Sequence, residues 1–326
     1  MEPREQPRGP AIAGINTDGE NLSIDYSANL MNLVLFFDPV SRTSLEAVEA
    51  AQILSLRYEK MSVGFWYVME PKFSCMYRAE IAGGTLKRLA LYSNTLFDVN
   101  SLLGLNAGIR TFPGALLVDS NGFIRMQCEG DIAFREIERS IQARLAISGY
   151  RVELPGIGEV DLELAHAHSV AVIRQLGYGS GDYPSGAMVV PEANQEFSLP
   201  DLFLSNTVYP HGDWYVGRDY LEGKNGSTIY LSCGREESVY LFAGSDKGAT
   251  LRVHTSIEPP NHLAIGRDLK NTDGLLDFRV SDYRPYEVIS CVGDGELMVS
   301  LQVMEGSLRL YSVEFCPLNQ LVAINH

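Results

Sequence analysis

The first half of the chain alternates strand-like and helix-like patterns. Leu33 to Phe37 is a continuous apolar run, which is typical of a strand covered on both faces. Thr43 and Glu46 have the spacing of a capping box, so we expect a helix to start there and to run to about residue 60. In residues 131–146 the apolar residues are three or four apart, as on one face of a helix: Phe134, Ile137, Ile141 and Leu145. The remaining predicted strands are 62–69, 89–92, 115–118 and 123–127, and a short helix is predicted at 73–81. The alternation predicts an α/β domain over residues 1–147.

The second half has a different pattern. From Ser198 onward, short β-type runs recur about every 8–12 residues and no long helical period is present. The runs are 214–216, 227–233, 238–243, 250–255, 275–280, 286–291, 296–303 and 308–315. This pattern predicts an all-β sandwich or jelly roll over residues 198–326. Residues 148–197 are rich in Gly, Pro and Asp and too long for a simple loop, so we expect a connector that wraps over one or both domains.

Composition and charge exclude several classes of protein. The 326 residues are 45% hydrophobic and 21% charged, so ordinary cores can form. The net charge of −15 repels phosphate backbones and anionic lipid, and we expect no nucleic-acid partner. No apolar run approaches the roughly 20 residues of a membrane span, so no membrane insertion is expected. The first ten residues lack an apolar signal core, which predicts a cytoplasmic protein, or an extracytoplasmic one if a leader has been trimmed away.

Metal and cofactor chemistry has little support in the sequence. The five cysteines are Cys75, Cys128, Cys233, Cys291 and Cys316, and no two form a Cys-x-x-Cys, so we expect buried, inert thiols. His166 and His168, with Asp161 and Glu163 near them, are interpreted as a polar linker rather than as metal ligands. We therefore expect no metal and no cofactor.

Two other polar groups have alternative interpretations. Asp38 and Glu70 follow two predicted core strands and are a candidate carboxylate pair, because α/β sheets often hold functional groups at strand ends. Asn225-Gly-Ser227 is a glycosylation sequon and, more simply, a hairpin turn.

Several stretches, taken in order, resemble a known fold. Val34 to Phe37, the tetrad Ser41-Arg-Thr-Ser44, the segment Thr111-Phe-Pro113, the hairpin at 119–122 and the final amphipathic helix are similar to the thioredoxin fold, in its TlpA-like subtype. The finer likeness is to the C-terminal region of DipZ-type proteins, in which such a domain precedes a carbohydrate-binding-module-like jelly roll. It rests on 15–19, 128–131, 212–214, 229–231 and 308–315. The resemblance covers about residues 11–317 and implies an α/β thioredoxin-like domain followed by an all-β jelly-roll sandwich domain. It also implies an extracytoplasmic location.

The chain departs from this family at the catalytic motif. The family has a Cys-x-x-Cys at the start of a helix, whereas this chain has Ser41-Arg42-Thr43-Ser44. Thiol–disulfide exchange requires a thiolate and a second thiol that resolves the mixed disulfide, and a serine hydroxyl supplies neither. The family's oxidoreductase activity therefore does not carry over to these positions.

The tetrad still suggests a binding corner. Pro113 aligns with the family's cis-proline, which faces the tetrad and pairs with a bound peptide backbone. We expect Arg42, Arg110, the helix N-terminus and the backbone of Thr111, Phe112 and Pro113 to bind a peptide, a protein or a small anion. The alternative is a decayed active site in which Ser41 and Ser44 only cap a helix.

Three other functions remain open. The first is a thiol–disulfide or peroxidase-like enzyme that uses a displaced cysteine, Cys75 or Cys128, with an external thiol to resolve it. The second is a glycan-binding module in which Tyr215, Tyr220, Tyr283 and Tyr286 contact sugar; Trp214 is expected in the core. The third is a two-domain particle that assembles into a larger complex. We favour a redox-inactive interaction protein with a protein or peptide partner.

Overall fold

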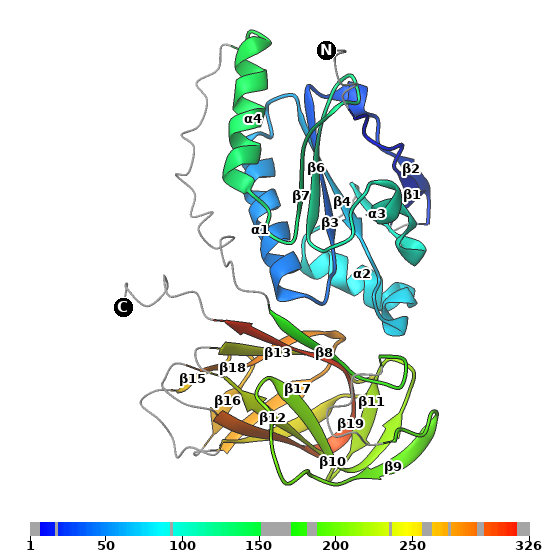
Figure 1. The fold of residues 1–326 in the computed structure, drawn as a ribbon, viewed down its shortest axis with the longest axis vertical. Coiled ribbons are helices and arrows are strands. Elements are labelled where there is room, and N and C mark those ends of the chain that lie inside the picture. Colours follow the sequence, from blue (N-terminus) through cyan, green and yellow to red (C-terminus); the bar gives the residue numbers. More distant parts are fainter. Residues whose placement is uncertain are drawn as a thin grey trace. The chain divides into compact units, whose positions relative to one another are not determined.

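The chain forms two compact units, residues 1–168 and 169–326 (Figure 1). The computed structural model describes residues 7–16, 19–91, 94–150, 171–180, 188–234, 237–255, 263–272, 275–291 and 297–317. Among these residues, no helix is both long enough and apolar enough to cross a membrane. Each unit is described in turn.

The first unit is built on a seven-stranded sheet. Its strands are β1 (Ala13–Ile15), β2 (Asn21–Ser23), β3 (Met31–Phe37), β4 (Val63–Met69), β5 (Thr95–Phe97), β6 (Gly114–Asp119) and β7 (Ile124–Glu129). The order across the sheet is β2-β1-β5-β4-β3-β6-β7. Strands β3, β4 and β5 are parallel, whereas β6 and β7 run antiparallel to their neighbours. Strands β1 and β2 pair antiparallel on either side of residues 16–20, ahead of the first core strand.

Strand β3 lies at the centre of this unit. All seven of its residues are buried, which confirms the prediction from the apolar run. Side chains alternate between the two faces of a strand. Val34 and Phe36 pack on one face in a cluster that includes Val68 and Leu116. Leu33, Leu35 and Phe37 therefore point to the other face, where the first helix packs against β3 and β4.

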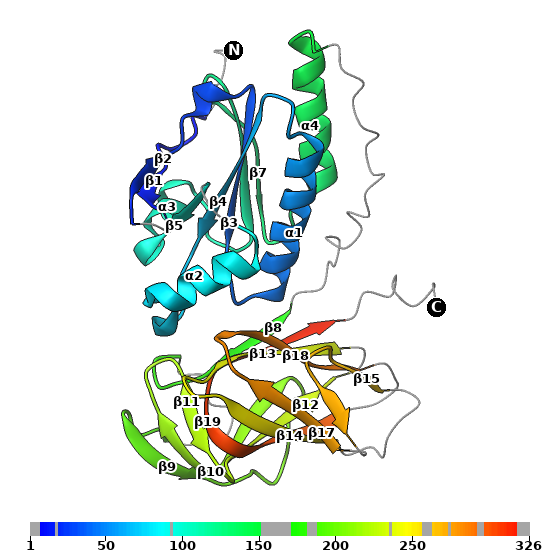
Figure 2. The ribbon, with the colours of Figure 1, turned by 180° about the vertical axis from the view of Figure 1, so that it is seen from behind.

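The helices of the first unit are α1 (Arg42–Arg57), α2 (Ala79–Arg88), α3 (Leu102–Asn106) and α4 (Phe134–Ile147). Short 3-10 turns are η1 (Tyr26–Ala28), η2 (Ser74–Tyr77) and η3 (Val99–Ser101). Helices α1 and α4 lie side by side in both views (Figures 1 and 2). A buried ion pair and a hydrogen bond connect them. Arg57 Nη1 lies 2.6 Å from Glu138 Oε1, and the Tyr58 hydroxyl donates to the same oxygen at 3.0 Å.

Two sequence predictions for this unit are corrected by the structure. Helix α1 begins at Arg42 with Ser41 as its N-cap, not at Thr43. Thr43 therefore lies inside the first turn, and Glu46 pairs with Arg42 at 2.8 Å. The strand predicted at 89–92 is wrong as well: Leu89 caps the C-terminus of α2, and the strand of this region is β5.

The second unit is made of antiparallel strands, and no helix is present among its described residues. Its strands are β8 (Val172–Gln175), β9 (Ala193–Phe197), β10 (Thr207–Val216), β11 (Leu221–Lys224), β12 (Thr228–Cys233), β13 (Glu237–Gly244), β14 (Ala249–Thr255), β15 (Leu263–Ile265), β16 (Lys270–Thr272), β17 (Leu275–Val280), β18 (Arg284–Cys291) and β19 (Leu297–Pro317). Two strands from the predicted connector belong to this unit, because β8 pairs with β19 and β9 pairs with β10.

Two long strands pass from one sheet to the other. Residues 207–211 of β10 pair with β12, whereas residues 212–216 pair with β9 and those from 214 onward also with β11. Strand β19 pairs with β12 and β14 up to Gly306, and with β11, β13 and β8 from Ser307 onward. The corners are Gly212 and Gly306, with φ of 79° and 83°. The runs 296–303 and 308–315, predicted as separate strands, are thus one strand bent at a glycine.

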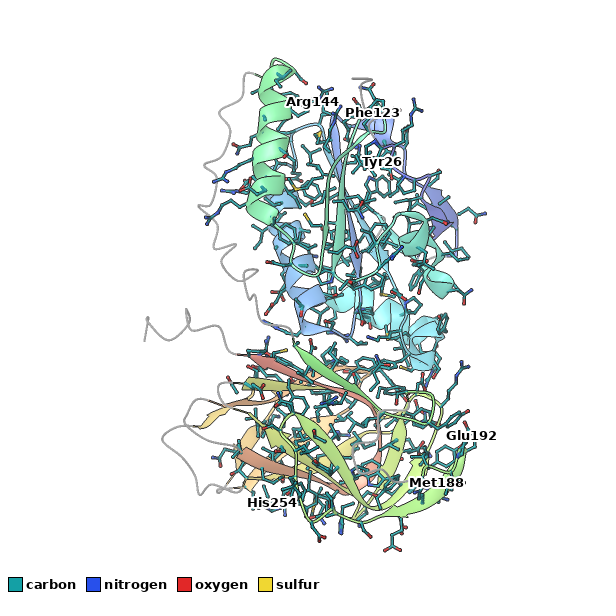
Figure 3. The ribbon with its side chains drawn as sticks, in the orientation of Figure 1. Tyr26, Phe123, Arg144, Met188, Glu192 and His254 are labelled. Atoms are coloured by element: carbon teal, nitrogen blue, oxygen red, sulfur yellow. The ribbon has the colours of Figure 1, made fainter. Side chains whose placement is uncertain are left out.

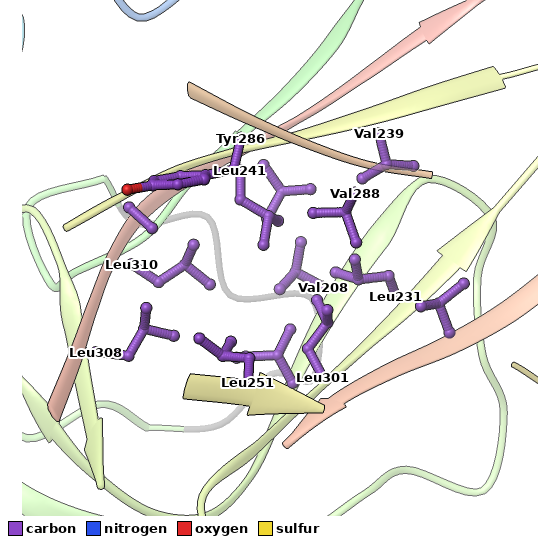
Figure 4. Close-up of a cluster of buried hydrophobic side chains, with 14 of the residues drawn as sticks. Val208, Leu231, Val239, Leu241, Leu251, Tyr286, Val288, Leu301, Leu308 and Leu310 are labelled. Atoms are coloured by element: carbon purple, nitrogen blue, oxygen red, sulfur yellow. The ribbon is translucent and has the colours of Figure 1, made fainter. Parts of the chain in front are cut away.

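The core of this unit lies between the two sheets (Figure 4). Val208, Leu231, Leu251 and Leu301 come from strands on one side, and Val239, Leu241, Val288 and Leu310 from strands on the other. Trp214 is 1% exposed and belongs to this core, as expected. The unit is therefore a β-rich domain of two facing sheets; its assignment as a jelly roll stays a prediction.

The bend at Gly306 predicts that a side chain at this position destabilises the protein. A Cβ added there would lie 2.2 Å from the Gly248 carbonyl oxygen, whereas one added at Gly226, with φ of 95°, meets nothing within 4 Å. Gly226→Ala therefore carries only the backbone penalty, about 1 kcal/mol. We expect Gly306→Ala to lower the free energy of unfolding by about 3 kcal/mol or more, because the clash adds to that penalty. Urea unfolding followed by circular dichroism measures both, and equal losses would contradict the corner's role.

Candidate functional site

The Ser41–Ser44 tetrad lies at the start of α1, but its serines face inward. Ser41 is 6% exposed and Ser44 is 0% exposed. The Ser44 hydroxyl accepts a hydrogen bond from the Asp38 N–H at 3.2 Å, and the Ser41 carbonyl accepts from the Leu45 N–H at 3.0 Å. The Ser41 side chain makes no capping hydrogen bond to the helix. These serines therefore stabilise the turn between β3 and α1 and present no nucleophile to solvent.

The structure brings the helix start and the Pro113 loop together. The Phe112–Pro113 peptide bond is cis, as the resemblance implies. Thr43 and Pro113 line one small cavity with Glu46, Ala47 and residues 130–132 and 134. Its volume of about 30 Å³ holds roughly one water molecule, not a ligand.

The two arginines do not complete this cavity. Neither Arg42 nor Arg110 is among the described residues that line it. The Arg42 guanidinium is held by Glu46 at 2.8 Å, and Arg110 is exposed. The geometry therefore gives no support to a small anion at this corner, because the Glu46 carboxylate competes for the same charge.

The loop before Pro113 is fixed on both sides of Phe112, whose backbone N–H and C=O have no partner among the described residues. The N–H groups of Arg110 and Thr111 donate to Glu129 Oε2 at 2.8 and 2.9 Å. These bonds, the one from Arg110 first, hold the pKa of Glu129 below its usual range. The Pro113 carbonyl accepts from the Gly130 N–H at 2.7 Å. Within the part of the chain that the structure describes, the N–H and C=O of Phe112 make no hydrogen bond.

Three carboxylates follow the ends of the parallel strands. Asp38 is 4% exposed; it accepts from the Val40 N–H at 2.9 Å and lies 3.3 Å from Lys72 Nζ. Burial raises the pKa of Asp38 against the opposing effect of Lys72. Burial also raises the pKa of Glu70, and the charges of Asp38 and Asp98 add to the effect. The structure thus places Asp38 near Glu70, as predicted.

The sequence reasoning missed the third carboxylate. Asp98 follows β5, which the sequence analysis placed several residues too early. Its oxygens accept the N–H groups of Leu103 and Gly104 at 2.8 and 2.7 Å, so it holds the start of α3. Among the described residues, no group of three or more His, Cys, Asp or Glu side chains is arranged to bind a metal.

The two candidate cysteines lie in environments that suppress reactivity. Cys75 is 4% exposed within η2. Cys128, in β7, is half-buried, and burial raises the pKa of its thiol although the Ala133 N–H opposes the shift. The thiolate is the reactive form of cysteine, so both environments disfavour exchange.

The four candidate tyrosines separate into two pairs. Tyr215 and Tyr220 line one cavity of about 560 Å³ beside β10 and β11. Tyr283 and Tyr286 are 7% and 1% exposed. The Tyr286 ring belongs to the core in Figure 4, so the prediction that Tyr283 and Tyr286 contact sugar is wrong: neither ring has a face open to a ligand.

Two further predictions concern other segments. Asp161, Glu163, His166 and His168 lie outside the described residues. Asn225 and Gly226 form the turn between β11 and β12, and the Ser227 hydroxyl donates to the Asp213 carbonyl at 2.6 Å. The sequon is therefore a turn, but the hairpin interpretation is wrong: β11 and β12 do not pair with each other, because β11 pairs with β10 and β19 in one sheet and β12 pairs with other parts of the same two strands in the other sheet.

Comparisons with known proteins give matches among solved structures only. No family model and no curated protein matches the chain. A thioredoxin-family thiol:disulfide interchange protein from Chlorobium tepidum is 14% identical, with a TM-score of 0.37, over 44% of this chain and 99% of its own. The thioredoxin domain of a thiol-disulfide oxidoreductase from Bacteroides vulgatus is 17% identical, with a TM-score of 0.36, over 42% and 96%. A hypothetical protein from Sinorhizobium meliloti is 11% identical, with a TM-score of 0.38, over 48% and 91%.

The topology of the first unit itself decides its fold. Strand β3, helix α1, strand β4 and helix α2 are followed by the antiparallel pair β6–β7 and helix α4, with β3 between β4 and β6 in the sheet. A cis-proline directly precedes β6 and faces the start of α1. The first unit has a thioredoxin-like fold.

The raised pKa of Asp38 has a consequence for stability. A carboxyl whose pKa is higher in the folded than in the unfolded state binds its proton more readily when folded. Its contribution to the free energy of unfolding is therefore lost as pH rises through the folded pKa. We expect Asp38→Asn, which keeps an acceptor for the Val40 N–H, to raise the urea midpoint at pH 8 relative to the unmodified chain and to leave it nearly unchanged at pH 4. The exposed Asp201→Asn is the control, and an Asp38→Asn effect that does not depend on pH would contradict this assignment.

Proposed function

We propose that the first unit is a peptide-binding module with a thioredoxin-like fold and no dithiol chemistry. The observation that carries the proposal is the polar backbone group of Phe112, its N–H together with its C=O, which makes no hydrogen bond to the described residues. Its neighbours are fixed by Glu129 and Gly130, so this group is presented in a rigid loop. An extended peptide pairs with such a group through its own backbone, which gives affinity without strict sequence specificity.

Apolar surface beside this loop supports the same assignment. The Phe112 ring lies against α3, where a Cβ added at Gly104 would be 3.6 Å from it. Leu102 and Leu105 of α3 are 56% and 60% exposed. Exposed leucines on the helix that contacts the Phe112 ring offer apolar surface to the side chains of a bound segment. The partner is therefore inferred to be a protein or peptide with apolar residues flanking an extended stretch.

Redox chemistry is disfavoured by the residues that replaced the thiols. Ser41 and Ser44 occupy the helix start at which the TlpA-like family carries its dithiol, and a hydroxyl pair cannot form a disulfide. Burial lowers the reactivity of the thiols of Cys75 and Cys128. The finer resemblance to DipZ-type regions, including the jelly-roll assignment, belongs to this proposal.

The loss of the dithiol is testable by restoring it. We expect no turnover of a disulfide reporter such as insulin by the unmodified chain. The double variant Ser41→Cys/Ser44→Cys places two thiols three residues apart at a helix N-terminus, which lowers the pKa of the first thiol. We expect it to acquire at least about tenfold more reductase activity than either single variant, which lacks the resolving thiol. Turnover by the unmodified chain would contradict the proposal, and its loss in Cys128→Ser would locate the chemistry.

The peptide site is testable on the unmodified chain. Peptides are selected from a displayed random library on the intact protein, and amide hydrogen exchange is then measured with and without a selected peptide. We expect the Phe112 amide to exchange at least about tenfold more slowly in the complex, because it gains a hydrogen bond. The Thr111 amide, already bonded to Glu129, is the internal control and should change little.

Two substitutions at Phe112 test the same hydrogen bond. Phe112→Pro removes the backbone donor and the ring and also restricts the backbone at residues 111 and 112, whereas Phe112→Leu removes only the ring. We expect about tenfold weaker peptide binding in the first and less than threefold in the second. Failure to select any peptide, or selected peptides that leave Phe112 exchange unchanged, would overturn the proposal.

A further inference from the structure

The segment of residues 99–106 is held to the first unit by little buried surface. It consists of η3 and α3; all its residues are described, and among them only Gly104 is buried. Val99, Leu102 and Leu105 are 44%, 56% and 60% exposed. Segments with so few buried contacts open at a lower free-energy cost than the core of the same protein. We call residues 99–106 the α3 segment.

The backbone at the start of the α3 segment is strained. Asn100 and Ser101 both have left-handed conformations, with φ of 68° and 56°. Residues other than glycine adopt this conformation at a cost in free energy, and then as single residues. The segment therefore keeps its shape only while contacts with the rest of the unit hold it there.

Two carboxylates provide such contacts. Asp98 is 1% exposed and accepts the N–H groups of Leu103 and Gly104 at 2.8 and 2.7 Å. The Ser101 hydroxyl donates to Glu70, which follows β4 in the chain. A titratable side chain is thus bonded directly to one of the strained residues.

Glu70 lies in a crowded group of charges. Among the described residues, the charges that act on it are those of Asp38 after β3, Lys72 after β4 and Asp98 after β5. Lys72 Nζ lies 3.3 Å from Asp38, so its charge is already engaged. Burial raises the pKa of Glu70, the two neighbouring carboxylates add to the effect, and the Ser101 hydroxyl and Lys72 oppose it. An ionised Glu70 is therefore costly while the segment is closed over it.

Closure of the α3 segment is coupled to the Glu70 proton. A carboxyl whose pKa is raised in the closed arrangement binds its proton more tightly there than when water reaches it. Closure is therefore favoured while Glu70 is protonated, and it weakens as pH rises through the raised pKa.

The α3 segment also adjoins the Phe112 loop. A Cβ added at Gly104 would lie 3.3 Å from Asp98 Oδ2 and 3.6 Å from the Phe112 ring, so the helix contacts both groups. Leu102 and Leu105, which offer apolar surface beside this loop, belong to the same helix. Opening of the segment would therefore withdraw that surface from a bound peptide.

We propose that Glu70 is a pH-dependent latch, which holds the α3 segment against the Phe112 loop when protonated and releases it when ionised. Three features support the latch: the hydrogen bond from Ser101, the strained backbone at that residue, and the carboxylates that crowd Glu70. The effect of the latch on binding rests on the peptide site proposed above, whereas the opening of the segment itself does not.

Amide hydrogen exchange on the full chain tests the latch without any peptide. We expect the protection factors of the Leu103 and Gly104 amides to fall at least about threefold from pH 5 to pH 8, because ionised Glu70 favours the open segment. Amides of β3 report global unfolding, and their higher protection would show that the segment opens separately. Protection of the α3 segment that does not fall with pH, or that equals the protection of β3, would overturn the proposal.

Substitutions then identify the group that titrates. Glu70→Gln keeps an acceptor for the Ser101 hydroxyl but cannot ionise, so we expect the α3 amides to stay protected at both pH values. Asp38→Asn removes one neighbouring charge and should reduce the fall without abolishing it. Glu192→Gln is the matched control and should keep the full fall. Glu192, labelled in Figure 3, is an exposed residue of the second unit that also accepts a hydroxyl hydrogen bond, from Tyr215. A fall that persists in Glu70→Gln would refute the latch.

Peptide binding separates the latch from the peptide site. With a selected peptide that has no titratable side chain, we expect the affinity of the unmodified chain to fall at least about threefold from pH 5 to pH 8. The affinity of Glu70→Gln should not depend on pH. Equal binding by the unmodified chain at both pH values would refute control of the site by the latch. Failure to select any peptide would refute the peptide site, and the exchange experiment would still decide whether the latch exists.

Discussion

The second unit depends on one bent strand. Strand β19 pairs with β12 and β14 in one sheet and, beyond Gly306, with β11, β13 and β8 in the other. The bend requires a backbone conformation that only glycine adopts easily, and the Gly248 carbonyl leaves no space for a side chain. The same strand contributes to the core before the bend and supplies Ser307 and Arg309 after it. The core of this unit and the positions of Ser307 and Arg309 therefore depend on the same backbone constraint.

The first unit depends in a similar way on strand β3. The apolar run Leu33–Phe37 within β3 favours burial on both faces, and the carboxyl end of the strand places Asp38 and the serine tetrad at one edge of the sheet. Burial there acts differently on different groups. It makes Ser44 a structural acceptor for the Asp38 N–H, and it makes the Asp38 carboxylate costly enough to raise its pKa. The backbone N–H and C=O of Phe112 make no hydrogen bond to the described residues, whereas its neighbours are bonded to Glu129 and Gly130.

The proposed peptide site and the proposed latch use different physics. The Phe112 loop offers a rigid pair of backbone hydrogen-bonding groups, which suit many peptide sequences and do not titrate. The latch uses a carboxyl that is crowded by Asp38 and Asp98, so its charge is costly where it lies. Since the chain as a whole is strongly acidic, the burial of those two carboxylates beside Glu70 carries more information than the net charge does.

The sequence alone determined the elements whose patterns are local. The apolar run of β3, the period of α4, the 119–122 hairpin and most strands of the second unit follow from side-chain alternation and turn residues, and these were predicted. The resemblance added the order of these elements, the pairing of the tetrad with Pro113 and the cis bond. Local patterns gave the wrong bounds for β5, because a short buried segment follows the end of a helix there. They also predicted two strands where β19 is one, because Gly306 bends the strand and does not end it.

Only the tertiary structure decided the sites. Nothing in the spacing of Glu129 and Thr111 shows that one fixes the other, because 18 residues and a strand reversal separate them. Tyr286 and Tyr215 look alike in sequence, yet one is in the core and the other lines a cavity. Glu70 and Ser101 meet because β4 and β5 are parallel neighbours in the sheet, so that both strands end at the same edge. Contacts between distant strands depend on which surfaces fit together over the core, and a single chain's local pattern does not contain that information.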